Sequence, residues 1–111
     1  MPTTSYQPGD LVLVSVPFSS GGGQKTRPAL VIADTGDDDL VVARMTSKSP
    51  KVAFDVPITE WQAAGLWAPG IVRVHKLITV EKVSISKWIG RLEATDRQQV
   101  AAIVRQLMSA W

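Results

Sequence analysis

The sequence predicts a small, mainly antiparallel β-barrel closed by a C-terminal α-helix, and three observations support this fold class. Short valine-rich runs alternate with Gly, Pro and Asp turn residues along the first 80 positions, as is typical of consecutive β-strands. Residues 95–110 instead carry apolar side chains at helical spacing. The chain has 111 residues, of which 45% are hydrophobic, so we expect one domain spanning residues 1–111.

The first strand is predicted over residues 11–16, after a Gly-Asp turn and before Pro17. Its valine-rich, mostly apolar character indicates a buried strand. Residues 18–26 contain three consecutive glycines, which disfavour both helix and strand. We therefore expect a mobile loop between the first two strands.

The next three strands are expected over residues 28–33, 40–45 and 52–56. Pro28 would begin the first of them, where a missing N–H does least harm. The acidic, Gly-containing stretch 34–39 predicts a solvated turn, so the strands on either side of it should pair as a hairpin.

The second half of the chain has weaker signals. A helical turn over 59–64 would pack Trp61 inward and stop at Gly65. Two further strands are predicted over 71–75 and 78–80.

The C-terminal helix is predicted after Gly90, which breaks the preceding segment. Thr95 and Gln98 match a capping box, with Thr95 as the N-cap. The apolar stripe that follows includes Val100 and extends to Trp111, so this helix should pack on the sheet.

Composition excludes several classes of chemistry. The chain has no cysteine, so disulfides, cysteine-ligated zinc, iron–sulfur clusters and a thiol nucleophile are excluded. Its single histidine excludes a two-histidine site within one chain, and we expect no cofactor. No apolar run approaches the ~18 residues of a membrane helix, and no signal-peptide pattern is present. These features favour a cytoplasmic protein, small enough that dimerisation would help to bury its core.

Five segments, taken together and in order, resemble the MazF/PemK family of toxins from type II toxin–antitoxin systems. The resemblance covers about residues 9–108, and its segments are residues 9–14, 25–32, 44–47, 70–74 and 89–92. It implies an SH3-like barrel of the type shared with CcdB, a homodimer, and a cognate antitoxin protein as partner. It also implies sequence-selective, metal-independent cleavage of single-stranded RNA (mRNA), leaving 2′,3′-cyclic phosphate and 5′-hydroxyl ends.

The resemblance makes Arg27 and Thr46 the catalytic pair. Cleavage passes through a phosphorane with extra negative charge, which fixed donors and cations stabilise. The Arg27 guanidinium can bind two phosphate oxygens at once, and Thr46 and Ser47 offer hydroxyl donors. Without the resemblance, these residues would read as an exposed strand charge and ordinary turn hydroxyls.

Arg73 and His75 form a second candidate cluster, because strand alternation would place them on one face. In part of the family, an acid follows the matching arginine two residues later, and here His75 takes that place. His75 could act as the general base or acid, or the role of the acid could be lost or moved. Arg73 is expected to contact RNA phosphate.

Four further residues are candidate RNA contacts along a phosphate track. They flank the candidates already described and are Lys25, Thr26, Lys48 and Lys76. For each lysine, a solvated surface position is the simpler interpretation.

Two other functions stay open at this point. One is a toxin that targets gyrase or another protein, for which Trp111 would be the active segment. The other is a non-catalytic SH3-like module that binds RNA. Three more tryptophans, Trp61, Trp67 and Trp88, could be core or dimer contacts, and the core is the default expectation.

Overall fold

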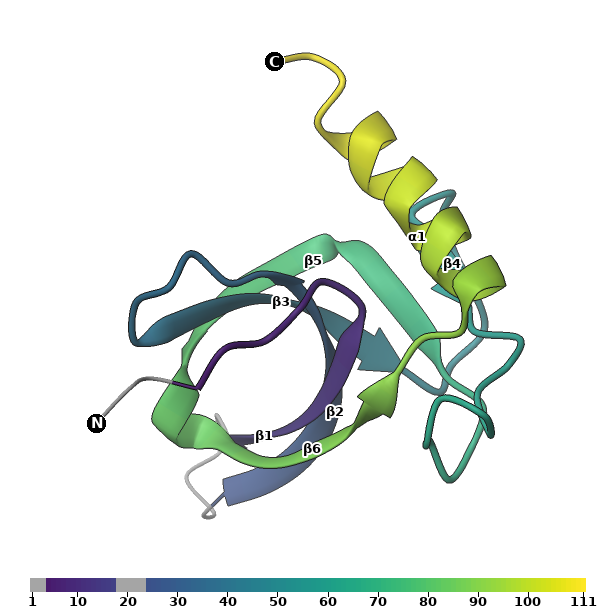
Figure 1. Ribbon diagram of the computed structural model, residues 1–111. Coiled ribbons are helices and arrows are strands. Elements are labelled where there is room, and N and C mark those ends of the chain that lie inside the picture. Colours follow the sequence, from purple (N-terminus) through teal and green to yellow (C-terminus); the bar gives the residue numbers. More distant parts are fainter. Residues whose placement is uncertain (1–3, 18–23) are drawn as a thin grey trace.

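The computed structural model describes residues 4–17 and 24–111, which form one six-stranded antiparallel sheet and a C-terminal helix (Figure 1). The strands lie in the order β4-β5-β3-β2-β1-β6 and curl into a ring, with α1 outside it. This confirms the predicted fold class. The elements are β1 (Asp10–Pro17), β2 (Gln24–Ala33), β3 (Asp39–Thr46), β4 (Asp55–Pro57), β5 (Ile71–Glu81), the 3-10 helix η1 (Lys82–Ser84), β6 (Ile85–Arg91) and α1 (Ala94–Leu107).

Two apolar clusters cover the two faces of the central strands. Val12 and Val14 of β1 belong to one cluster, and Leu11 of the same strand belongs to the other. The second cluster also contains Val100 from α1, so the helix covers that face. Burial on both faces explains why the first strands read as continuous apolar runs rather than as alternating patterns.

β5 is a single long strand, where the sequence predicted two. Its pairing with β3 jumps at one point: Ala43 pairs with Leu77, but the next residue, Arg44, pairs with Arg73. Residues 74–76 therefore have no partner on β3, and β5 bends there. A register shift of this kind leaves no clear signal in the local sequence.

β2 begins at Gln24, so the predicted strand start at Pro28 is wrong. Pro28 lies inside the strand, opposite Leu13 of β1. Pairing of β2 with β3 begins only at Ala29, so Pro28 needs no ladder partner on that side. Of the predicted loop, residues 18–23 lie outside the described residues.

Gly90 lies within β6 rather than breaking the chain, which corrects the prediction for this segment. A Cβ at Gly90 would collide with the carbonyl oxygen of Ala64, because the 59–66 turn lies directly against β6. That turn is present as predicted, and Gly65 adopts a positive φ of 100° at its end. Glycine is therefore required here for close approach.

The predicted capping box is wrong, because Glu93 is the N-cap residue of α1 and makes no side-chain cap bond. Asp96 has a different role. Its side chain is fully buried and accepts hydrogen bonds from Thr59 and Glu60. Asp96 therefore connects α1 to the segment that follows β4 through hydrogen bonds.

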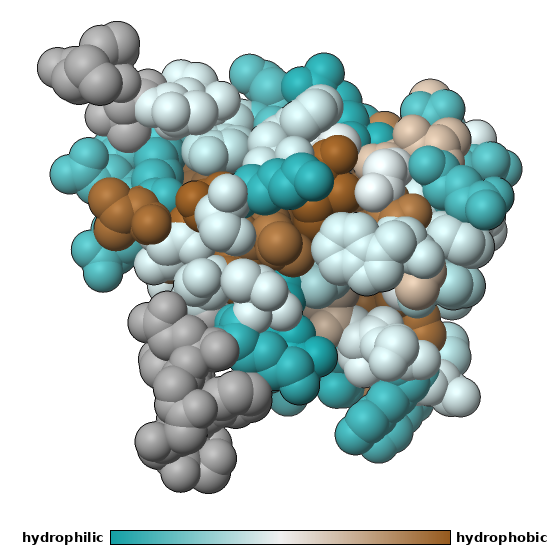
Figure 2. All heavy atoms as spheres, turned by 90° about the horizontal axis from the view of Figure 1, so that it is seen from below, coloured by the Kyte–Doolittle hydropathy of each residue, from teal (hydrophilic) through white to brown (hydrophobic). Residues whose placement is uncertain are grey.

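Two of the three tryptophans that the sequence places in the core by default are exposed instead. Trp61 packs against the core, but Trp67 and Trp88 are 65% and 52% exposed. Trp111 lies beyond the last residue of α1 and is fully exposed, so it is not part of the helix's apolar stripe. Figure 2 shows apolar surface across the middle of the face on which β6 runs.

Candidate functional site

The predicted site residues cluster around the start of β2, the end of β3 and the start of β5. Arg44 of β3 pairs with Ala29 of β2 on one side and with Arg73 of β5 on the other. Arg73 in turn pairs with Asp55 of β4. Directly paired residues project to the same face of a sheet. The register therefore places these four residues in one row across four strands.

A buried carboxylate holds Arg73 in position. The Nε of Arg73 donates to Oδ1 of Asp55 at 3.2 Å. The Asp55 side chain is only 1% exposed, whereas that of Arg73 is 29% exposed. The backbone N–H of Lys51 donates to the other carboxylate oxygen at 2.9 Å.

The pKa of Asp55 lies below its ordinary value. Burial acts to raise this pKa, but the N–H groups of Lys51 and Val52, together with the charge and the hydrogen bond of Arg73, lower it by more. Asp55 is therefore ionised at neutral pH, and its hydrogen bond to Nε fixes one edge of the partly exposed Arg73 guanidinium.

Thr46 lies two residues beyond Arg44 on the same strand, where it pairs with Ile71. Its Oγ1 accepts the N–H of Lys48 at 3.1 Å, which leaves the hydroxyl hydrogen able to donate elsewhere. Arg27 is exposed and pairs with Val14 of β1. Pairing of β2 with β3 stops at Ala29. Continuing that register by two residues would place Arg27 opposite Thr46.

The other predicted contacts flank these positions. Lys25 and Thr26 are exposed at the start of β2, but alternation places Thr26 on the opposite face from Lys25 and Arg27. Ser47 and Lys48 are exposed in the turn that follows β3.

His75 and Lys76 lie in the part of β5 that has no partner on β3. The His75 ring contacts the Phe54 ring, with centroids 5.9 Å apart. Its Nδ1 is buried without a hydrogen-bond partner among the described residues. In the described parts of the chain, no hydrogen bond or ion pair joins His75 to Arg73, so the structure does not bring these two predicted residues together by a polar contact.

Sequence reasoning missed Arg44 and Asp55. Arg44 is the single charged residue in the otherwise apolar run 40–45, and Asp55 is the single acid of the predicted strand 52–56. Both charged residues are visible in the sequence as interruptions of apolar runs. Only the pairing of β3, β5 and β4 shows that they lie on either side of Arg73. An acid does lie beside Arg73, and it comes from β4 rather than from two positions along β5.

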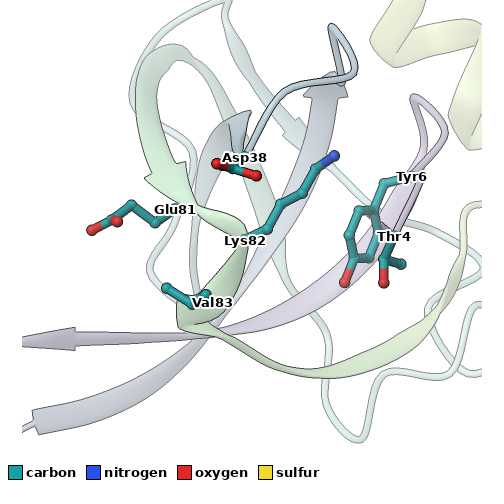
Figure 3. Close-up of a pocket in the computed structure, with 6 residues that line it drawn as sticks. All are labelled: Thr4, Tyr6, Asp38, Glu81, Lys82 and Val83. Atoms are coloured by element: carbon teal, nitrogen blue, oxygen red, sulfur yellow. The ribbon is translucent and has the colours of Figure 1, made fainter. Parts of the chain in front are cut away.

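A pocket of about 400 Å³ lies elsewhere, beside the N-terminal segment and η1 (Figure 3). Its cation is already paired, because Lys82 Nζ lies 3.0 Å from Oδ1 of Asp34. The N–H of Tyr6, more than any other group, holds the pKa of Asp34 below its ordinary value. None of the predicted RNA contacts lines this pocket, whose lining residues are Thr4, Tyr6, Asp38, Glu81, Lys82 and Val83.

Residues 4–17 and 24–111 contain neither a metal-binding cluster of side chains nor a membrane-spanning helix. These residues contain no group of three or more acidic or histidine side chains arranged to hold a metal ion. Within the same residues, no helix is long and apolar enough to cross a membrane.

Comparison with known proteins identifies the family to which this chain belongs. Residues 7–108 match the family model described as PemK-like, MazF-like toxin of type II toxin–antitoxin systems. The chain therefore belongs to this toxin family. A search of curated protein sequences found no significant match.

Solved structures show the same fold at low sequence identity. A mycobacterial endoribonuclease in complex with its cognate antitoxin superposes with a TM-score of 0.77 at 13% identity, covering 95% of this chain and 96% of that one. MazE–MazF from Deinococcus radiodurans gives 0.76 at 18%, covering 96% and 97%. The Mycobacterium tuberculosis toxin MazF-mt6 gives 0.68 at 20%, covering 88% and 96%. At these identities the similarity establishes the fold alone.

Proposed function

We propose that this protein is a sequence-selective, metal-independent endoribonuclease toxin that cleaves single-stranded RNA and is inhibited by a cognate antitoxin. Membership of the toxin family supports this proposal. The observation that supports the proposal most is the group of basic residues where the end of β3 meets the start of β5. There, a buried carboxylate fixes Arg73 beside Arg44, and Thr46 follows on the same strand.

The chemistry needs charge stabilisation more than a strong nucleophile. The ribose 2′-oxygen forms a bond to the neighbouring phosphorus, and the bond from phosphorus to the 5′-oxygen breaks. The proton leaves the 2′-oxygen, and the departing 5′-oxygen gains a proton. The Arg27 guanidinium and the Thr46 hydroxyl would stabilise the negative charge that develops on the phosphorane oxygens.

Proton transfer falls to His75 in this proposal. Arginine is a poor base, because its pKa exceeds ~12. Asp55 is already engaged by Arg73 and Lys51, so it positions rather than exchanges protons. Since Nδ1 of His75 is enclosed, proton transfer by this residue would use Nε2.

Binding of the RNA strand would use Arg73 and the flanking residues of the phosphate track. The proposed contacts are Lys25, Thr26, Ser47, Lys48 and Lys76. The proposed functional form is a homodimer. The antitoxin would compete with RNA for this basic surface.

The test is to incubate the purified protein with a long single-stranded RNA in excess EDTA, and to map the cuts and their end groups. Wild-type protein should cut at a recurring short sequence and leave cyclic phosphate and 5′-hydroxyl ends. Arg27→Ala should lose about 10²–10³-fold in rate. Arg105→Ala, an exposed arginine on α1, is the matched control and should retain activity.

Two results would count against the proposal. Absence of cleavage by folded, antitoxin-free protein would favour a protein-targeting toxin or a non-catalytic RNA-binding module. Equal cleavage by Arg27→Ala would remove Arg27 from the catalytic group while leaving the ribonuclease activity in place.

A further inference from the structure

Arg44 and Arg73 face each other on neighbouring strands with no charge between them. They are direct partners in the β3–β5 register, so their side chains leave the sheet on the same face. Like charges in directly opposed positions destabilise a sheet. Asp55 offsets part of this repulsion through its ion pair with Arg73, and an anion bound beside both arginines would offset the rest.

The donors of the two arginines are largely unused. Of the Arg73 nitrogens, only Nε donates a hydrogen bond to Asp55. Within residues 4–17 and 24–111, neither its terminal nitrogens nor the Arg44 guanidinium has a hydrogen-bond partner. Arg44 is also exposed. The register therefore places two guanidinium groups with unused donors on the same face of neighbouring strands, and guanidinium donors are well suited to phosphate oxygens.

Asp55 adjusts the charge of this pair. Its carboxylate neutralises one of the two positive charges and, being buried, is held away from solvent on the far side of Arg73. The row Arg44–Arg73–Asp55 therefore carries a net charge of +1. That charge matches a phosphodiester group, which carries a single negative charge.

We propose that Arg44 and Arg73 form a second phosphate subsite, which binds the RNA phosphate next to the one that is cleaved. This inference rests on the proposed ribonuclease function and adds Arg44 as a residue that positions the substrate. Arg44 and Thr46 are two residues apart on β3, a step of about 6.6 Å. That step is comparable to the spacing of successive phosphates along an extended RNA strand. One phosphate on Arg44 and Arg73 would therefore place its neighbour at Thr46 and Arg27.

The test measures binding of a fully 2′-O-methylated oligoribonucleotide, which cannot undergo attack by a 2′-hydroxyl. Dissociation constants are measured from about 0.05 to 0.3 M KCl for the wild type, Arg44→Gln, Arg44→Lys and the control Arg105→Gln. For single strands, each lost phosphate contact reduces the slope of log K against log salt by about 0.7. Arg44→Gln should show that reduction and bind about fivefold more weakly at 0.1 M salt.

The two other variants and the melting temperature sharpen the result. Arg44→Lys should keep the wild-type slope because it keeps the charge, and Arg105→Gln should leave both slope and affinity unchanged. Without RNA, Arg44→Gln should melt about 1–2 °C above the wild type, because it removes the repulsion of Arg73.

The outcomes separate this inference from the proposed function. If the wild type binds RNA and Arg44→Gln keeps the same slope, the subsite is refuted and the ribonuclease proposal stands. An equal slope change in Arg105→Gln would also refute it, because the effect would then reflect net charge alone. Failure of the wild type to bind RNA at low salt would overturn both.

Discussion

Replacing Asp96 by alanine should destabilise this protein more than its place in the first turn of an exposed helix suggests. Its side chain is fully buried. One oxygen accepts the backbone N–H and the hydroxyl of Thr59, at 3.0 and 2.8 Å, and the other accepts the N–H of Glu60 at 2.8 Å. All three bonds join α1 to the segment after β4, so the alanine variant loses the polar connection between them.

The magnitude follows from those three bonds. Hydrogen bonds to charged groups contribute about 1.5–3 kcal/mol each. Thr59 and Glu60 are exposed residues, so water replaces part of what is lost. We therefore expect the free energy of unfolding to fall by about 3 kcal/mol, which lowers the melting temperature by roughly 12 °C or more for a domain of this size.

Thr95→Ala is the matched control, because Thr95 is the N-cap that the sequence favours. Thr95 is exposed, and the N-cap of α1 is Glu93. Thr95→Ala should therefore cost less than about 0.5 kcal/mol. Thermal unfolding of all variants by circular dichroism, at one protein concentration, makes the comparison. A larger loss for Thr95→Ala than for Asp96→Ala would refute this reasoning and restore the capping box.

Three further substitutions should change the free energy of unfolding in predictable ways. Gly90→Ala should lower the free energy of unfolding by about 3 kcal/mol, because its Cβ meets rigid backbone. Gly70→Ala should cost less than about 1 kcal/mol, because its Cβ meets only the mobile end of Met45; similar urea midpoints for the two would contradict this contrast. Asp34→Asn should flatten the acid side of the stability curve. The depressed pKa of Asp34 gives stability that is complete above its unfolded value of 3.8 and is lost as the pH falls through the folded value. Unfolding free energies between about pH 5 and 3 measure this, and an unchanged slope in Asp34→Asn would contradict it.

The strands of the first half were predictable because their signals are local. Valine-rich runs and turn residues located β1 and β3 to within about a residue. The acidic turn between the second and third strands correctly predicted their pairing. The C-terminal helix was clear from its periodicity, although its first turn was misread. Asp96 satisfies backbone groups of a distant segment, and no local pattern reports such a contact.

The site was harder to predict because its key contacts cross strands. Arg73 was a candidate, but its partner Asp55 lies 18 residues away and becomes its neighbour only through β4–β5 pairing. The alternation that predicted His75 on the face of Arg73 assumes a regular strand. That assumption fails here, because the β3–β5 register shifts after Ala43 and leaves residues 74–76 without partners on β3. The same shift brings Arg44 opposite Arg73, and it depends on tertiary packing rather than on local propensity.

The most direct test of the central claim, that RNA binds where the ends of β2, β3 and β5 meet, is to map amide chemical shifts on titration with the 2′-O-methylated oligoribonucleotide. We expect the largest shifts around Arg27, Thr46 and Arg73, with little change along α1. Shifts centred on α1, or on the pocket beside Lys82, would contradict it.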